Sequence, residues 1–474
     1  MSEKQRLHPS AVFFTLLKTF KELIVSIGIG FFAFRDAGLY FVLGVGALIL
    51  VMLVFSILSW YRYTYRVEDD ELRIEYGILI RKKRYISKNR IQSIDLTQSV
   101  IHRLFKLTMV KIETAGSGTG TEASLKAVRL EVGESLREEL KTLQSANREV
   151  EEVEETDTNN PSQTITFKRL FLAGTTSGSI GIIFIIISAL FSELVQFVPD
   201  EYYENTFQTI SSFSVILMIV FGICLLVIIW CLGIAGTMIK NGNFTITKID
   251  NELFITRGLL EKKQTTIPVR RIQAVGIDES LLRQPLGYVT MYAEVAGGSV
   301  EKGEDFSTVL FPIIKKTEID DFLDKFLPDY VSDRSDLTGL TKQALTFYLV
   351  RFSAIFILAV VATLFLVPQF AWAPIILLVL SVSLGLLQYK DAGFQNDGEQ
   401  LTLRYRVLNR KTIILYHKRI QSFERKQHLF QRRASLATVK ISIVSKLGAG
   451  KHYKIRDLKV ESGNELASWY SYRD

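Results

Sequence analysis

The chain has 474 residues, of which 48% are hydrophobic and 22% are charged, and its mean hydropathy is +0.21. It is too apolar for an ordinary soluble protein and too charged to lie wholly within a membrane, so we expect membrane spans alternating with soluble domains. The two cysteines, Cys224 and Cys231, lie in one apolar run, which favours small apolar side chains over a disulfide or metal pair.

The chain begins with residues 1–10, a polar and basic segment without a cleavable signal pattern, which we expect to be a cytoplasmic N-terminus. Two apolar stretches follow, at about Ala11 to Phe34 and about Leu39 to Trp60. Each is close to the roughly 20 residues that a helix needs to cross about 30 Å of hydrocarbon. Residues 11–60 therefore predict a transmembrane hairpin.

The same pattern predicts two more transmembrane hairpins, at residues 167–240 and 344–390. Basic residues gather where the six helices meet the soluble segments. The connection within the second hairpin is acidic instead, with Glu193, Asp200 and Glu201. The positive-inside rule then places both termini and all soluble domains in the cytoplasm, in a multi-pass protein of the cell membrane.

A repeated unit follows each hairpin, at residues 61–145, 241–330 and 391–474. Apolar and polar residues alternate near the start of each unit, as at Leu72 and Ile74, which is typical of half-buried strands. An Arg-Ile-Gln motif then marks the same position in all three units, at Arg90 to Gln92, Arg271 to Gln273 and Arg419 to Gln421. Each unit is therefore predicted to be a small antiparallel β domain.

The copies differ in one respect. A glycine precedes the motif by the same distance in the first two copies, at Gly77 and Gly258, whereas the third copy has Arg406 there. Amphipathic patterns predict a closing helix around Leu136 and Leu140, a second after Thr317 with Ile319, Phe322, Leu323 and Phe326 on one face, and a third from Leu466 to Tyr470.

The order of helix pair then domain, together with the strand, glycine, basic segment and Arg-Ile-Gln pattern, resembles bacterial pleckstrin-homology-like (PH-like) membrane proteins of the YdbT type. The resemblance covers nearly the whole chain. It implies six transmembrane helices in three hairpins, each followed by a PH-like antiparallel β barrel or sheet with a C-terminal helix. It also implies binding or scaffolding without an established enzymatic activity, a role in envelope stress or protection against membrane-active peptides, and a smaller PH-like membrane protein as partner.

Two segments are expected to be linkers, at residues 146–166 and 331–343. The first holds six acidic residues between positions 148 and 157, and such a run of like charge repels itself and cannot bury a core.

The third unit is the basic one, with 17 Lys and Arg against 7 Asp and Glu from Phe394 to Asp474. Anionic headgroups of the cytoplasmic leaflet would attract such a surface, whereas no nucleic-acid-binding motif accompanies it. The residues predicted to form this membrane-surface patch are Arg410, Lys411, Lys418, Arg425, Lys426, Arg432 and Arg433.

The repeated motif leaves two interpretations open. Arg90, Arg271 and Arg419, with Gln92, Gln273 and Gln421, could bind a phosphate or carboxylate ligand, since a guanidinium group offers a planar pair of donors. Alternatively, each arginine caps a loop or pairs with an acid while the intervening isoleucine fills the core, and repetition in three diverged units favours this structural role.

No arrangement of residues typical of a catalytic, metal or cofactor site occurs in the sequence, so we expect no enzyme, no metal and no cofactor. Two function classes remain: a membrane-anchored binding or scaffolding protein, and a transporter or channel formed by the six helices. Charged residues well inside a predicted span are confined to Lys18, Lys21 and Glu22. A transport path needs more polar lining than this, so the first class is favoured.

Overall fold

The fold was obtained as a computed structural model, which describes residues 4–33, 38–68, 71–114, 123–145, 160–178, 215–296, 307–332, 337–444 and 450–471, together with residue 334 and isolated positions between 181 and 192. The chain divides into two compact units. Unit 1 comprises Met1–Asn159 with Leu260–Pro268, and unit 2 comprises Asn160–Leu259 with Val269–Asp474.

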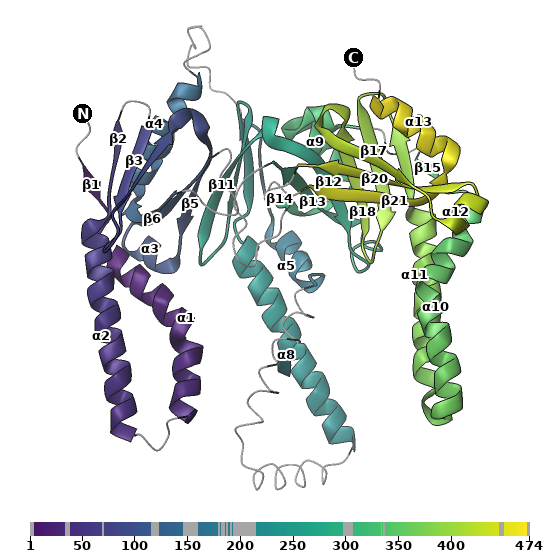
Figure 1. The fold of residues 1–474 in the computed structure, drawn as a ribbon, viewed down its shortest axis with the longest axis horizontal. Coiled ribbons are helices and arrows are strands. Elements are labelled where there is room, and N and C mark those ends of the chain that lie inside the picture. Colours follow the sequence, from purple (N-terminus) through teal and green to yellow (C-terminus); the bar gives the residue numbers. More distant parts are fainter. Residues whose placement is uncertain are drawn as a thin grey trace. The chain divides into compact units, whose positions relative to one another are not determined.

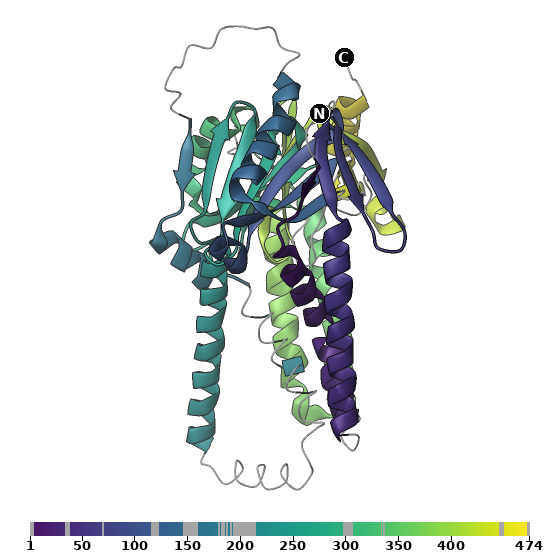
Figure 2. The same ribbon diagram turned by 90° about the vertical axis from the view of Figure 1, so that its left-hand side faces the viewer.

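Unit 1 begins with the helix pair α1 (Ala11–Ala33) and α2 (Gly38–Arg62), which lie side by side (Figures 1 and 2). A four-stranded antiparallel sheet follows, in the order β1 (Gln5–Arg6), β2 (Thr64–Glu68), β3 (Glu71–Tyr76) and β4 (Lys82–Ser87). The predicted alternation is confirmed, because Leu72 and Ile74 are buried while their neighbours in β3 are partly exposed.

The second sheet of unit 1 contains β5 (Ile91–Gln98), β6 (Leu107–Thr114) and β7 (Ala123–Arg129). The short helix α3 (Val100–Leu104) connects β5 to β6, and α4 (Leu130–Ser145) packs across the sheet (Figures 1 and 2). Leu136 and Leu140 of α4 are buried in one core with Leu96, Val110 and Leu125, as the amphipathic pattern predicts.

Unit 2 contains α5 (Phe167–Thr175), α8 (Val215–Asn241) and the strands β8 (Ser162–Thr164), β9 (Thr245–Ile249) and β10 (Glu252–Arg257). The rest of the second repeat is β12 (Ile272–Glu279), β13 (Tyr288–Val295), β14 (Thr308–Lys315) and α9 (Ile319–Phe326). All four apolar residues predicted on the inner face of α9 are buried.

The third repeat follows α10 (Lys342–Leu366) and α11 (Trp372–Asp391), which lie side by side (Figure 1). Its strands are β16 (Gly393–Asn396), β17 (Gln400–Arg406), β18 (Arg410–Tyr416), β19 (Ile420–Lys426), β20 (Leu436–Ile443) and β21 (Lys451–Lys459). The helix α12 (Leu429–Arg433) lies between β19 and β20, and α13 (Val460–Ser471) follows β21. A short strand, β15 (Thr338–Gly339), precedes α10. Leu466 of α13 is fully buried, as predicted.

Strands of neighbouring repeats pair with each other, which the sequence did not reveal. Strand β18 of the third repeat pairs with β12 of the second, giving the seven-stranded order β14-β13-β12-β18-β17-β16-β15. Within unit 1, β11 (Lys262–Pro268) of the second repeat pairs with β5 of the first. The core is likewise continuous across these two repeats, because Ala274 and Tyr292 of the second repeat lie in one core with Leu401 and Ile413 of the third.

Six spans were predicted, and the described residues contain four helices that are long and apolar enough to cross a membrane: Gly38–Arg62, Ile219–Asn241, Lys342–Leu366 and Pro368–Asp391. The predicted first span is the helix α1, but Lys18, Lys21 and Glu22 interrupt its apolar sequence. Nine of the 22 residues of the predicted third span, from Leu170 to Phe191, lie outside the described residues.

Candidate functional site

The Arg-Ile-Gln motifs lie at equivalent short 3₁₀ turns, at Lys88–Arg90, Val269–Arg271 and His417–Arg419. The three isoleucines, Ile91, Ile272 and Ile420, are buried. Arg271 donates from Nε (3.0 Å) and Nη2 (2.6 Å) to the backbone oxygen of Ala296. This arginine thus uses its donor pair to hold a neighbouring loop, as in the structural interpretation.

The other motif residues have different surroundings. Arg90 and Gln421 are exposed, and Arg419 is partly buried near Tyr330. Gln273 is buried and donates to the backbone oxygen of Arg271 (3.1 Å), while the side chain of Gln92 lies outside the described part of the chain. The motif therefore marks a repeated turn at which the described polar side chains have different surroundings.

Apolar side chains are exposed at one connection of each repeat, which we call the apolar turns: residues 99–106, 280–287 and 428–435. In the first, Leu104 is 78% exposed and Phe105 is 55% exposed. In the third, Leu429 is 77% exposed and Phe430 is 69% exposed. Leu282 and Leu286 are exposed in the second. Such side chains repeated at one structural position indicate a surface that is covered in the working protein.

Each apolar turn is fastened to the first helix of its own pair. The ring of His102 stacks on Phe14 of α1, with the ring centroids 3.7 Å apart. Arg283 is buried and donates to Thr176 Oγ1 (2.9 Å) at the end of α5. In the third repeat, Gln431 donates to Asp457 Oδ1 (2.6 Å), whose other carboxylate oxygen pairs with Arg351 of α10 (2.6 Å). The turns therefore lie where the helices enter the β domains.

A second exposed apolar pair occurs in each repeat at the hairpin that precedes the Arg-Ile-Gln motif. These hairpin tips are Leu79–Ile80, Leu259–Leu260 and Val407–Leu408, and all six side chains are exposed. The amide of Leu259 donates to Ile239 of α8 (2.9 Å), and Gln388 of α11 donates to the backbone oxygen of Val407 (2.8 Å). The hairpin tips in unit 2 are thus fastened to the second helix of each pair.

Unit 1 also has a cavity of about 540 Å³ between its helix pair and its sheets. Its walls are apolar at Phe55, Trp60 and Leu79, and Lys126 and Arg84 supply positive charge. Lys126 donates to Thr15 Oγ1 (3.4 Å). Burial, with a smaller contribution from nearby Lys18, lowers the pKa of Lys126. A negatively charged group in the cavity would oppose this shift, so the cavity suits an anionic ligand with an apolar part.

The seven residues of the predicted basic patch do not form one surface. Arg425, Lys426, Arg432 and Arg433 are exposed beside or within α12. Lys418 is exposed near Tyr416, at the other end of β19 and about 20 Å away by the rise of an extended strand. Arg410 and Lys411 pair instead with Glu279 and Asp278 of β12.

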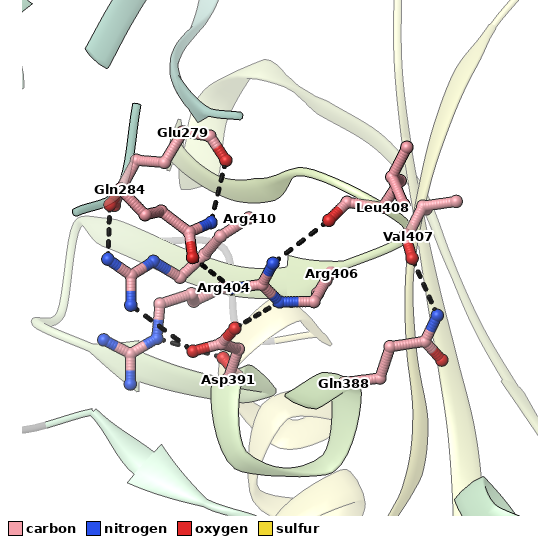
Figure 3. A network of polar contacts seen from close by, with 9 residues as sticks. All are labelled: Glu279, Gln284, Gln388, Asp391, Arg404, Arg406, Val407, Leu408 and Arg410. Carbon is pink, nitrogen blue, oxygen red and sulfur yellow. Dashed lines mark hydrogen bonds and ion pairs between the residues drawn. The ribbon is translucent and has the colours of Figure 1, made fainter. Parts of the chain in front are cut away.

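Arg410 belongs to a polar network that joins α11 to the sheet of unit 2 (Figure 3). Arg406 donates from Nε to Asp391 Oδ2 (2.5 Å) and from Nη2 to Gln284 Oε1 (2.9 Å). Arg410 contacts the other oxygen of Asp391 (3.4 Å). The sequence carried a signal for this network, since Arg406 stands where the other repeats have a glycine.

Where β5 pairs with β11, burial disfavours the charged form of the carboxyl group of Asp95. Asp95 accepts a hydrogen bond from the amide of Thr266 in β11 (3.3 Å). Burial, reinforced by nearby Glu113, raises the pKa of Asp95 to about 7. The folded protein therefore holds a proton on Asp95 at pH values where the unfolded chain has released it.

From this we expect stability to fall as pH rises from about 4 to about 7, by about 4 kcal/mol from this group. Asp95→Asn should flatten this part of the pH profile and raise the melting temperature above pH 7, because the amide is never charged. Thermal unfolding in detergent between pH 5 and 8 measures this, with Asp250→Asn as an exposed control. Parallel profiles for wild type and Asp95→Asn would contradict the assignment.

Comparison with known proteins agrees with the repeat architecture. The family model described as "Bacterial PH domain" matches residues 12–144, 182–328 and 353–474. The chain is 36% identical over 490 residues to the UPF0699 transmembrane protein YdbT of Bacillus subtilis (strain 168), covering 100% of this chain and 99% of the relative. No solved structure matches. The chain therefore belongs to the bacterial PH domain family and is a membrane protein of the YdbT type.

Proposed function

We propose that this protein is a non-enzymatic membrane anchor that holds three PH-like domains on the cytoplasmic leaflet, where they bind anionic headgroups. The observation that carries the proposal is the pair of exposed apolar sites in each repeat, the apolar turn and the hairpin tip, on the side where the helices enter the domain. Exposed Leu and Phe side chains at that level would enter the boundary between headgroups and acyl chains.

The proposal includes six transmembrane helices in three hairpins with both termini in the cytoplasm. The ionisable groups within α1 support this in part, because Lys18 and Glu22 are one helical turn apart with Nζ and Oε1 at 4.0 Å. Basic residues beside the domains, such as Arg62 at the end of α2 and Lys240 at the end of α8, support the orientation.

Electrostatics supports a preference for anionic lipid in the third repeat. The exposed Leu429 and Phe430 stand beside Arg432 and Arg433 in α12, with Arg425 and Lys426 just before it. Each basic residue near an anionic surface contributes about 1 kcal/mol. The cavity of unit 1, with Lys126 and Arg84, offers a second place for a phosphate group beside an apolar wall.

The test uses the full chain in lipid nanodiscs, with Cys224→Ala and Cys231→Ala removing the native thiols. An environment-sensitive fluorophore on Leu429→Cys is expected to be quenched by lipids labelled near the headgroup. Quenching should be stronger in discs containing 30% phosphatidylglycerol than in phosphatidylcholine alone, and 0.5 M salt should weaken the difference because exposed charges are screened over about 10 Å at 0.1 M salt.

Two variants complete the experiment. Arg432→Gln with Arg433→Gln should remove most of the difference between the lipids while leaving basal quenching. The fluorophore on Asn464→Cys, in the exposed face of α13 on the opposite side of the domain from α10 and α11 (Figure 1), should show little quenching. Equal quenching at both positions, or quenching that ignores lipid charge and salt, would refute the proposal.

We also propose that the protein works in a membrane complex that protects the envelope against membrane-active peptides, with a smaller PH-like membrane protein as partner. Resemblance to the YdbT type is the support for this. A strain lacking the protein should be more sensitive to such a peptide, and Leu429→Asp with Phe430→Asp should fail to restore resistance. Full restoration of resistance by that variant would show that protection does not require contact of Leu429 and Phe430 with the leaflet.

A further inference from the structure

The two pairings between strands of neighbouring repeats have the same register. In unit 1, Lys262 and Lys263 of β11 lie opposite Gln98 and Thr97 of β5. In unit 2, Arg410 and Lys411 of β18 lie opposite Glu279 and Asp278 of β12. Counted from the Arg-Ile-Gln motif, Gln98 and Glu279 are the same position, as are Lys262 and Arg410. The strand before the motif in one repeat (β11 or β18, the fourth strand of its repeat) thus pairs with the strand after the motif in the preceding repeat (β5 or β12, the fifth strand) in the same register.

The first repeat has the corresponding fourth strand, β4, but no repeat precedes it in the described chain. β4 pairs with β3 along its whole length and forms the last strand of its sheet among the described residues. Its residues Lys82 to Tyr85 are exposed, whereas most of β18 is buried. Tyr85 is 56% exposed, while Ile414 at the same position of β18 is fully buried.

The charge on β4 specifies what can pair with it. Lys82 occupies the position of Lys411, which pairs with Asp278 (3.7 Å between Nζ and Oδ2), and Lys83 follows it. Cross-strand pairs of opposite charge stabilise a sheet, and like charges directly opposite each other destabilise it. An edge strand that matches β4 should therefore carry carboxylates opposite these lysines.

A second copy of this chain does not meet that requirement. The fifth strand of the third repeat, β19, lies at the edge of its described sheet and would be the acceptor in a head-to-tail assembly. In the shared register, Lys426 would face Lys82 and Arg425 would face Lys83. These two like-charge pairs disfavour the assembly.

We propose that β4 is a docking strand for a different protein, which adds an antiparallel edge strand bearing carboxylates opposite Lys82 and Lys83. Main-chain hydrogen bonds supply the affinity in such an addition, and the side chains supply the specificity. The proposal gives the membrane complex proposed above a contact surface, and it does not depend on lipid binding.

The test uses the full chain in detergent with Cys224→Ala, Cys231→Ala and Tyr85→Cys. The probe is an eight-residue peptide with the sequence of Ile272–Glu279 carrying Val275→Cys and Ile277→Asp. Val275 lies opposite Ile414, the counterpart of Tyr85, while Asp278 and the new carboxylate at 277 take the positions opposite Lys82 and Lys83. A second peptide keeps Ile277→Asp but carries Gly276→Cys in place of Val275→Cys, which puts the thiol on the other face of the strand. A third keeps Val275→Cys and carries Ile277→Lys with Asp278→Lys. Each peptide thiol carries a 2-thiopyridyl group, so that attack by the protein thiolate forms the mixed disulfide and releases 2-thiopyridone. Rates of mixed-disulfide formation are normalised to the reaction of each activated peptide with free cysteine.

We expect the first peptide to react about tenfold faster than either of the others, and Lys82→Glu with Lys83→Glu in the protein to invert the preference between acidic and basic peptides. Equal rates for the three peptides would overturn the proposal. So would a Tyr85→Cys thiol that reacts with the small disulfide 2,2′-dithiodipyridine but with none of the activated peptides, since the strand would then be covered by its own chain.

A second arm tests the assembly of identical copies. Under a mild oxidant such as copper phenanthroline, the double variant Tyr85→Cys with Phe423→Cys would join two copies by a disulfide if β4 paired with β19 in the shared register. Efficient formation of such dimers would overturn the requirement for a different protein. Because both arms report only on the strand edges, their failure is distinguishable from a failure of the fluorophore experiment on lipid contact.

Discussion

Asp391→Ala is expected to destabilise the protein by roughly 3–5 kcal/mol, because it leaves two guanidinium groups without their shared carboxylate. The side chains of Arg406 and Asp391 are 2% and 11% exposed, so water does not replace the lost ion pair fully. Arg410 loses its contact with Asp391 as well and keeps only Glu279 among its ion pairs described here. The melting temperature should fall by on the order of 5–10 °C.

The control is Glu465→Ala, which removes an exposed carboxylate from α13 and should change the melting temperature by less than about 1 °C. The double variant Asp391→Ala with Arg406→Leu should recover part of the loss, since it removes one unpaired buried charge. An additive double variant would show that the two residues act separately, which is the opposite of what Figure 3 implies.

The elements of this fold were largely predictable because they leave periodic marks in the sequence. Alternation at Leu72 and Ile74 predicted strand β3, and the spacing of Phe322 and Phe326 predicted the buried face of α9. The partner of each strand was not predictable. The apolar sequence of β18 predicts a strand but does not show whether its neighbour is β19 of the same repeat or β12 of the preceding one.

The candidate site was predictable only in part, for a similar reason. The Arg-Ile-Gln motif stood out because it repeats, but repetition reflects the shared turn and the buried isoleucine. The apolar turns repeat in position and differ in sequence. Their helices α3 and α12 have five residues each, too few for a helical period to emerge. Arg410 and Lys411 counted as surface charge until the structure placed Glu279 and Asp278 opposite them.

Arg283→Leu is expected to cost roughly 2–4 kcal/mol and to loosen α5 from the second repeat. Arg283 is 8% exposed, and its guanidinium group joins three elements: it donates to Thr176 Oγ1 and the backbone oxygen of Ala173 at the end of α5, to Thr290 Oγ1 in β13, and to the backbone oxygen of Pro312 in β14. Leucine fills much of the volume but cannot donate, so these acceptors lose a buried partner.

The residues that lose protection from hydrogen exchange distinguish this role from a general destabilisation of the core. Hydrogen exchange should accelerate first in residues 170–178, because Arg283 is the side chain that bonds both Ala173 and Thr176, while exchange in β20 and β21 should stay near the wild-type rate. Arg270→Leu, at an exposed arginine of the neighbouring turn, is the matched control. If exchange in Arg283→Leu rose equally throughout unit 2, Arg283 would support the whole sheet, and the second apolar turn would need another attachment to its helix.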